Sequence, residues 1–347
     1  MSNDTPAPTP HKRRPRYSGK NPRRFEDKYK EHNPERYAET VAKVIASGKT
    51  PAGMHVPIML HEIIEVLALQ PGERVVDCTL GYGGHAKALL QAVQPGGILL
   101  GLDQDPQEIV KTETRLRSLG FPEESVVVRR MNFAGILRAL TEVGWAEGAD
   151  AVLADLGVSS MQIDNPSRGF SFKHDGPLDM RMNPQRGLPA SEVLARVSAE
   201  KLQAMLMENA DETRAVVLGA ALAGRKIERT RELAAMVRSA LPRGMAEDDV
   251  DATVRRVFQA LRIEVNDEFG VLDTWLRALP SSLKPGGRVA VLTFHSGEDR
   301  RVKKAFKAGL LDGTYSRIAD EVVRAGPEEL RLNPRASSAK LRWAVRS

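Results

Sequence analysis

The chain has 347 residues, of which 41% are hydrophobic, so it is long enough and apolar enough to form a proper core and two domains. Its one cysteine, Cys78, excludes an internal disulfide framework and favours a reducing cytoplasm as the location. No apolar run approaches the ~18 residues of a membrane span, and no apolar segment follows the basic start of the chain, so neither a membrane protein nor a secretory signal is expected.

The excess of positive charge lies in the first 50 residues. They hold 12 Lys+Arg and 6 Asp+Glu, which leaves 39 of each (51 − 12 and 45 − 6) for the rest of the chain. This stretch is rich in proline and poor in large apolar residues before Phe25, a composition typical of a disordered, solvated leader. The alternative is a basic arm that binds the backbone of a nucleic acid and weakens as salt is added.

The first predicted helix covers residues 60–67, and the strand at 74–76 after it leads into a glycine-rich turn. That turn, from Asp77 to His85, reads Asp-Cys-Thr-Leu-Gly-Tyr-Gly-Gly-His, and apolar residues then recur at helical spacing up to Val93. Glycine allows backbone N–H groups to come close to a ligand and adopts positive φ without strain. The turn therefore predicts a nucleotide-type ligand, and a tight turn without a ligand is the alternative.

The next predicted strand, 97–103, ends in Asp103, 20 residues after Gly83 (103 − 83). A carboxylate at this spacing can accept both hydroxyls of an adenosine ribose, in a dinucleotide or in S-adenosylmethionine. The carboxylate of Asp77 ahead of the glycines, and the pattern Gly81-x-Gly83-Gly84 in place of Gly-x-Gly-x-x-Gly, favour S-adenosylmethionine. A loop-capping role is the alternative for Asp103.

Strands and helices continue to alternate after Asp103. Further apolar strands are expected at 125–128 and 151–155, with a helix over 136–143 between them. This order predicts a parallel sheet covered on both faces. Several polar or aromatic residues follow the carboxyl ends of its strands, where such sheets bind ligands. They are Asp77, Asp103, Asn132, Phe133 and Asp155.

The alternation stops after Asp155. A segment at 156–184 shows no strand or helix period, but its aromatic and methionine side chains argue against disorder, so it is either a packed connector or a loop over the ligand crevice. Residues 191–250 show helical spacing only and predict an inserted helical domain. A long helix over 254–279 and a fifth strand at 288–294 then restore the sheet, and 341–346 could add a closing edge strand.

The segment His295 to Arg300 follows the fifth strand. Ser296 with Asp299 three residues later is typical of a capping box at the start of a helix, and contact with the substrate is the alternative. A hydrolase is disfavoured because no Gly-x-Ser-x-Gly elbow is present. The seven histidines show no metal-ligand spacing, so no metal is expected.

Together these segments resemble the bacterial 16S rRNA (cytosine-N4)-methyltransferases. The most specific are Asp155-Leu156-Gly157-Val158-Ser159-Ser160-x-Gln162 and the block from Arg168 to Met182. The others are His55-Val56-Pro57, Asp77 to His85, Asp103-x-Asp105-Pro106, Phe258 to Ile263, Lys284 to Arg288, Phe294-His295-Ser296 and Asn333-Pro334-Arg335.

The resemblance implies a fold, a cofactor and a substrate. The fold is an α/β class I S-adenosylmethionine methyltransferase, Rossmann-like with a mostly parallel sheet and an inserted all-helical domain. Its expected parts are a tail at 1–50, the methyltransferase domain at 51–165 and 251–347, and the connecting loop with the inserted domain at 166–250. The cofactor is S-adenosyl-L-methionine, and the partner is 16S rRNA in a small ribosomal subunit or its precursor. The oligomeric state is left open, with a dimer as one option.

The resemblance also assigns site residues. Those expected to contact the cofactor are Gly83, Gly84, His85, Asp103, Phe133, Asp155 and Gln162. Asp155, with the backbone carbonyls of Leu156 and Gly157, is the candidate catalytic group. The lone pair of N4 is delocalised into the cytosine ring, and groups that accept hydrogen bonds from the N4–H groups would draw the amine toward tetrahedral geometry. The candidate RNA contacts are Arg168, Phe170, Phe172, Lys173, His174, Arg181, His295, Ser296, Arg335 and Lys340, with core packing as the alternative for the phenylalanines.

Three departures from the family pattern are visible. Gly297 stands where leucine is usual, Ser337 where arginine is usual, and 251–255 where His-Pro-Ala-Thr-Arg is usual; the tail before His55 is expected to have no counterpart in the family. Two other functions stay open, the first of them because of the departures at Gly297 and Ser337. One is a non-catalytic assembly factor of the small subunit with the same fold, and the other is a dinucleotide-dependent oxidoreductase.

Overall fold

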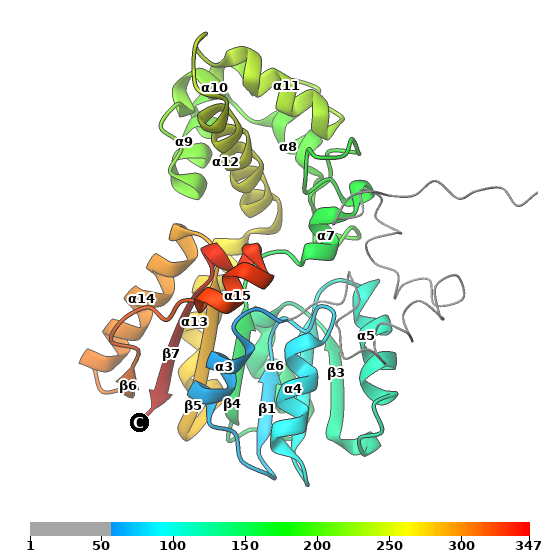
Figure 1. Cartoon of the computed structure of the whole chain (residues 1–347), viewed down its shortest axis with the longest axis vertical. Coiled ribbons are helices and arrows are strands. Elements are labelled where there is room, and N and C mark those ends of the chain that lie inside the picture. Colours follow the sequence, from blue (N-terminus) through cyan, green and yellow to red (C-terminus); the bar gives the residue numbers. More distant parts are fainter. Residues whose placement is uncertain (1–56) are drawn as a thin grey trace, which may run out of the picture. The chain divides into compact units, whose positions relative to one another are not determined.

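A computed structural model describes residues 57–347 of the chain. These residues lie within one compact unit (Figure 1). The expected basic tail at 1–50 falls outside the described residues, as do His55 and Val56. Within residues 57–347, no helix combines the length and the apolar character that crossing a membrane requires.

A seven-stranded sheet with the order β3-β2-β1-β4-β5-β7-β6 carries the fold. Its strands are β1 (Arg74–Asp77), β2 (Ile98–Asp103), β3 (Val126–Arg130), β4 (Ala149–Asp155), β5 (Leu283–Thr293), β6 (Tyr315–Ile318) and β7 (Lys340–Arg346). Strands β1 to β5 are parallel, and β7 runs antiparallel between β5 and β6. The predicted Rossmann-like class is confirmed, and the strand order reverses between β1 and β4, the position at which such sheets bind ligands.

The expected closing edge strand was misplaced. The C-terminal segment forms β7, but β6 pairs with its far side and is the edge. The four residues of β6, Tyr-Ser-Arg-Ile, are too few and too polar to predict a strand, and only Tyr315 among them is buried. Pairing with β7 holds them in the sheet.

Helices cover both faces of the sheet (Figure 1). On one face lie α3 (Leu60–Leu67), α4 (Gly84–Val93) and α5 (Glu108–Arg117), and on the other lie α6 (Ile136–Glu142), α13 (Glu268–Ser282) and α14 (Ser296–Leu311). Successive strand residues point to opposite faces, so Val75 packs with the first group and Val76 with the second. Such strands are apolar throughout because both faces are buried.

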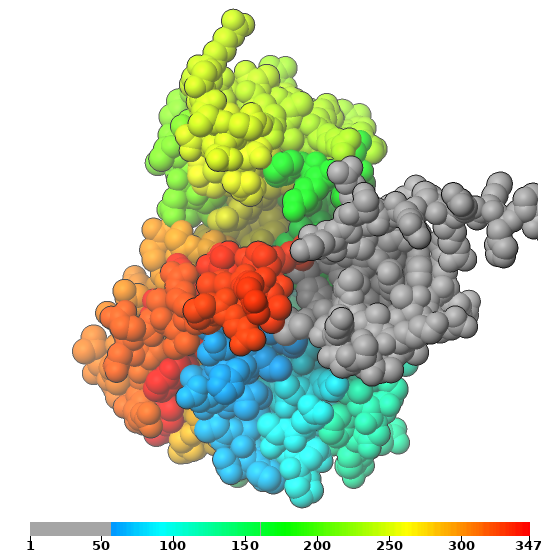
Figure 2. Space-filling view, in the orientation of Figure 1, coloured from blue at the N-terminus to red at the C-terminus, as the bar shows by residue number. Residues whose placement is uncertain are grey.

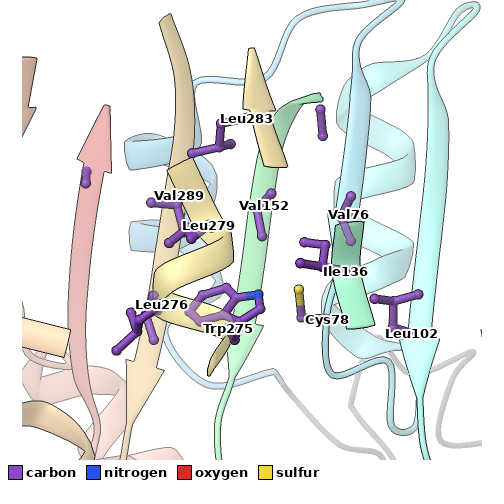
Figure 3. Close-up of a cluster of buried hydrophobic side chains, with 14 of the residues drawn as sticks. Val76, Cys78, Leu102, Ile136, Val152, Trp275, Leu276, Leu279, Leu283 and Val289 are labelled. Carbon is purple, nitrogen blue, oxygen red and sulfur yellow. The ribbon is translucent and has the colours of Figure 1, made fainter. Parts of the chain in front are cut away.

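The second face is built around Trp275 of α13, which is fully buried. Figure 3 shows its ring among Cys78, which follows β1, Val152 in the middle of β4, and Ile136 at the start of α6. Truncating a buried tryptophan to alanine typically costs about 3–5 kcal/mol. This packing fixes the level at which β1 ends and therefore the position of the glycine turn that follows.

A separate apolar cluster contains the helices inserted after β4. They are α8 (Ala190–Arg196), α9 (Ala199–Ala210), α10 (Ala215–Leu222), α11 (Thr230–Ala240) and α12 (Glu247–Asn266). The single helix expected over 254–279 is wrong, because the chain breaks at Asp267, a left-handed residue with a φ of 48° between α12 and α13. Since the buried residues of α12 pack in this cluster, we propose that the helical part extends to Asp267, beyond the expected limit at 250.

Candidate cofactor and substrate site

The glycine turn connects the end of β1 to the start of α4. Gly83 precedes α4 with a φ of 83°, which an L side chain adopts only with strain. A Cβ at Gly83 would lie 2.7 Å from Cγ2 of Thr112, and a Cβ at Gly84 would lie 2.7 Å from Cγ of Pro57. The glycines therefore let the turn pack closely against α5 and against the segment that enters α3.

Asp103, at the end of β2, fastens this turn to the sheet. Its Oδ2 accepts the N–H of Gly81 at 2.7 Å and its Oδ1 accepts the N–H of Asp105 at 2.8 Å. Burial raises its pKa to about 6, although these two hydrogen bonds act in the opposite direction. Each carboxylate oxygen keeps a second lone pair, so the residue fits the expected pairing with two ribose hydroxyls.

Asp155, at the end of β4, faces His85 in the first turn of α4. The Nε2 of His85 lies 3.0 Å from the carbonyl oxygen of Ile58, so Nε2 carries the proton, and burial lowers the pKa of the imidazole. Its Nδ1 lies 3.6 Å from Oδ2 of Asp155. The structure thus brings the acidic residue and the neutral imidazole together at the carboxyl edge of the sheet.

One carboxylate oxygen of Asp155 is buried and has no hydrogen-bond donor among the described residues. Burial, and then the charge of Glu298, raise the pKa of Asp155 to about 7. Its Oδ1 is buried and accepts no hydrogen bond from residues 57–347, whereas 29% of the side-chain surface remains exposed to an incoming group. A buried acceptor without a donor is costly, so this atom marks a place where a ligand donor or cation would be stabilised.

Asp77 lies between these two carboxylates and is 1% exposed. Burial raises its pKa to about 6. The nearby His85 lowers the pKa, and the charges of Asp155 and Asp103 raise it. Three carboxyl groups with raised pKa values therefore meet at the ends of β1, β2 and β4. Such clustering is typical of functional sites.

Sequence reasoning missed several residues that hold this arrangement. Thr79 donates its N–H to Oδ1 of Asp77 at 3.0 Å and accepts the N–H of Asp155 on its hydroxyl at 2.7 Å. In α5, the hydroxyl of Thr112 donates to the carbonyl oxygen of Gly81 at 2.5 Å. Only the threonine between Asp77 and the glycines could have been suspected from the sequence, because Thr112 is distant in the chain.

Two other expected cofactor contacts are placed beside the cluster. Phe133 follows β3, is half-buried, and packs edge to face on Trp275 with ring centroids 5.8 Å apart. The amide of Gln162 caps α7 (Ser160–Asp164) by accepting the N–H of Ser159 at 2.9 Å, and it donates to Oδ2 of Asp105 at 3.0 Å. Phe133 is only partly buried and can still contact a ligand, whereas the amide of Gln162 is already engaged within the protein.

Arg168 is not placed as a surface phosphate contact, which corrects the sequence-based expectation. The residue is 9% exposed, and its Nη1 donates to Oδ2 of Asp105 at 2.7 Å. Its Nη2 donates to the carbonyl oxygens of Arg181 and Met182. The guanidinium therefore holds the 168–182 loop.

The two phenylalanines of this loop face the helical cluster. Phe170 is 9% exposed and belongs to its buried core. Phe172 packs edge to face on Phe258 of α12, with centroids 5.2 Å apart. The core-packing alternative therefore fits both better than stacking on a base. Lys173 and His174 beside them are exposed and remain candidates for RNA contact.

The other basic candidates have carboxylate partners. The guanidinium of Arg181 donates two hydrogen bonds to Asp179, that of Arg335 donates two to Asp164, and Nζ of Lys340 lies 3.4 Å from Oδ2 of Asp299. These pairs are partly exposed, so a phosphate could compete for them. The acids that they pair with, Asp179, Asp164 and Asp299, are not those of the cluster of Asp77, Asp103 and Asp155.

The expected capping box at Ser296 is wrong. The N-cap of α14 is His295, without a side-chain cap, and the hydroxyl of Ser296 instead donates to Oδ2 of Asp211 at 2.8 Å. Asp299, the expected partner, pairs with Arg342 at 2.6 Å. Ser296 is thus used to connect α14 to the end of α9.

One group of side chains has the donor atoms for a metal ion. Glu268, His295 and Glu298 place one ligand atom each within 4.8 Å of one another. However, both carboxylate oxygens of Glu268 accept hydrogen bonds from Arg262, at 2.8 and 2.9 Å, and Nε2 of His295 lies 3.2 Å from Oε1 of Glu298. The guanidinium already supplies the positive charge that a cation would bring.

Comparison with known proteins gives consistent matches. The model of the MraW methylase family matches residues 52–347. Ribosomal RNA small subunit methyltransferase H 1 of Agathobacter rectalis is 50% identical over 345 residues, covering 97% of this chain and 98% of the relative. The protein of the same name from Lachnoclostridium phytofermentans is 49% identical, covering 97% of this chain and 93% of that relative. This coverage corrects one expectation, because most of the tail before His55 aligns with these relatives.

Solved structures are more distant. A SAM-dependent O-methyltransferase of Thermotoga maritima is 12% identical with a TM-score of 0.37, covering 83% of this chain and 64% of that chain. The fold assignment rests on the strand order and not on this likeness.

Proposed function

Because the chain belongs to the MraW methylase family, we propose that it transfers a methyl group from S-adenosylmethionine to the exocyclic N4 of a cytidine in small-subunit ribosomal RNA. The observation that supports this most is the meeting of Asp77, Asp103 and Asp155 beside the glycine turn, at the position where the strand order reverses. The relatives named above carry small-subunit ribosomal RNA methyltransferase in their names. Such a substrate implies a cytoplasmic protein.

The charges of the site fit the proposed methyl donor. The donor carries a sulfonium and an ammonium group, and positive charge beside three carboxyl groups of raised pKa would favour their ionised forms. A dinucleotide would instead add the negative charge of its pyrophosphate to an already acidic site. The oxidoreductase alternative is therefore disfavoured on electrostatic grounds.

In this proposal the residues named would hold each part of the donor. Asp103 would accept the ribose hydroxyls, Phe133 would contact the adenine, and the glycine turn would allow close approach of the backbone. The bound donor supplies an electrophilic methyl group on sulfur. The work of the protein is then to align the N4 lone pair with that methyl group and to exclude water.

Asp155 has two tasks in the reaction. As the N4–CH₃ bond forms and the C–S bond breaks with its electron pair, N4 becomes positively charged and must lose a proton. Before the transfer, the ionised carboxylate of Asp155 accepts a hydrogen bond from the N4–H group. After the transfer, it takes the proton that N4 loses. The Nδ1 of His85, 3.6 Å from Oδ2 of Asp155, is placed to receive it next.

The direct test is transfer of a labelled methyl group from S-adenosylmethionine to protein-free small-subunit RNA and to isolated small subunits, followed by mapping of modified cytidines. We expect label at N4 of one cytidine with at least one of the two substrates. A non-catalytic assembly factor would bind the subunit without label transfer. A protein that is stabilised against heat by NAD and not by S-adenosylmethionine would contradict the proposal.

A further inference from the structure

Helix α14 carries four exposed cations on one face. They are Arg300, Lys303, Lys304 and Lys307, at the spacing i, i+3, i+4 and i+7. At ~1.5 Å of rise per residue this α14 stripe is about 10 Å long. The opposite face of the helix buries Val302 and Phe306 against the sheet, so the cations point away from the core. Figure 2 shows the orange segment that contains them at the molecular surface.

The three lysines of the α14 stripe have no acid paired with them among the described residues. Glu298 is buried, and Asp299 pairs with Arg342 and Lys340. Arg300 alone has a partner, Asp211 at 3.0 Å. Across the described chain, no carboxylate lies within the 4.0 Å ion-pair distance of Nζ of Lys303, Lys304 or Lys307.

The net charge of the chain does not explain such a stripe. Outside residues 1–50, cations and anions number 39 each (51 − 12 and 45 − 6), so four cations on two turns of one helix are a local concentration. On other helices the exposed cations either have acids beside them, as Lys111 has Glu108 and Arg138 has Glu142, or stand singly, as Lys87 and Lys201 do.

The α14 stripe is continuous with the proposed active site. Helix α14 begins at Ser296, three residues after β5 ends at the same edge as Asp155. Glu298, in its first turn, is close enough to Asp155 for its charge to act on that carboxyl group. From this edge the helix runs beside β6 and β7, as Figure 1 shows. A polyanion whose reacting group lies at Asp155 would therefore meet the stripe.

We propose that the α14 stripe binds the phosphate backbone of the RNA beside the target nucleotide, an inference that rests on the proposed function. A length of about 10 Å corresponds to about three phosphates at the ~3.4 Å spacing of a stacked strand. Lysine ammonium groups act as point charges and contact phosphates without reading the bases. The stripe then sets the register of the RNA and leaves the choice of base to the residues around Asp155.

The test compares the full chain with two triple variants. Lys303→Gln/Lys304→Gln/Lys307→Gln removes the unpaired charges of the stripe, and Lys111→Gln/Arg138→Gln/Lys226→Gln removes three charges that are paired with glutamates elsewhere. The affinities for protein-free small-subunit RNA and for assembled small subunits are measured over a range of salt concentrations, and the affinity for S-adenosylmethionine is measured for each protein.

We expect the log–log salt slope of the stripe variant to be shallower by about 2, at ~0.7 per phosphate contact, with RNA binding ten- to a hundredfold weaker near 0.1 M salt. The control variant should match the wild type, and donor affinity should be equal in all three. Equal slopes in the stripe and control variants would overturn the inference. So would a loss seen only with assembled subunits, which would indicate an acidic protein partner. Absence of methyl transfer by the wild type, with the slope difference intact, would instead refute the proposed function.

Discussion

Nη1 of Arg168 lies 2.7 Å from Oδ2 of Asp105, and the two residues are 9% and 1% exposed. Asp105 follows β2 and adjoins Asp103, the carboxylate that we propose accepts the ribose hydroxyls. Arg168 is the first residue of the 168–182 loop. Its Nη2 donates hydrogen bonds to the carbonyl oxygens of Arg181 and Met182 in the same loop, at 3.1 and 2.8 Å. This ion pair therefore fastens the loop to the cofactor end of the sheet.

Replacement of Arg168 by alanine should lower the free energy of unfolding by about 3–5 kcal/mol, because it leaves the buried carboxylate of Asp105 without its charged partner. Urea unfolding monitored by circular dichroism measures this. Arg196→Ala, at an exposed pair with Glu192 of the same helix, is the matched control and should cost under about 0.5 kcal/mol. Equal losses for the two variants would show that the buried pair has no special weight.

Asp155→Asn should separate activity from stability. We expect methyl transfer to fall about 10²-fold or more, since the amide cannot take a proton from N4. The pKa of about 7 in the folded protein lies above the ordinary value of 3.8, so this group lowers the stability progressively as pH rises from 3.8 to about 7, and the full loss is present above that range. At pH 8 the variant should therefore be more stable, by roughly 2 kcal/mol, less than the full shift because the side chain is partly exposed.

Asp103→Asn is the control for that gain. Both oxygens of Asp103 accept backbone N–H bonds, and an asparagine side chain can accept only one of them. This variant should lose stability although the pKa of Asp103 is also raised. Thermal unfolding at pH 8 decides the matter, and a gain in both variants would mean that charge removal alone sets the stability of the site.

Donor affinity should increase with pH. The cationic donor favours the ionised forms of Asp103 and Asp155, whose pKa values are about 6 and about 7, so binding releases protons. The affinity for S-adenosylmethionine should therefore rise between pH 5.5 and 8 and level off above that range. Isothermal titration at pH 6.5 in buffers of different ionisation enthalpy counts the protons. An affinity that falls as pH rises would contradict the assigned charges.

Gly297→Ala should destabilise the protein, although alanine usually favours a helix. A Cβ at Gly297 would lie 2.5 Å from Cζ of Phe269 and 3.2 Å from Nδ1 of His295. Overpacking of this kind costs about 1–3 kcal/mol. In a Phe269→Leu background the cost should largely disappear, which a double-mutant cycle of unfolding free energies measures. Additive effects would show that the ring does not occupy the space of a side chain at 297.

The sequence alone was enough for the fold class and for the main strands. Strands buried on both faces read as apolar runs, and the turn from Asp77 to His85 is local, so the spacing along the chain reports both. Residues at strand ends, such as Asp103 and Asp155, could be grouped because the rule for parallel sheets places all those ends at one edge. Their roles in binding and catalysis remain predictions.

Contacts between distant segments decided the rest. The pairing of β6 with β7, the burial of Arg168 on Asp105 and the contact of Thr112 with the glycine turn all join residues far apart in the chain. A charged or short polar segment reads as surface until its partner is known, because burial of a charge depends on which opposite charge reaches it. The α14 stripe shows the converse, since only the folded chain reveals which lysines have no carboxylate beside them.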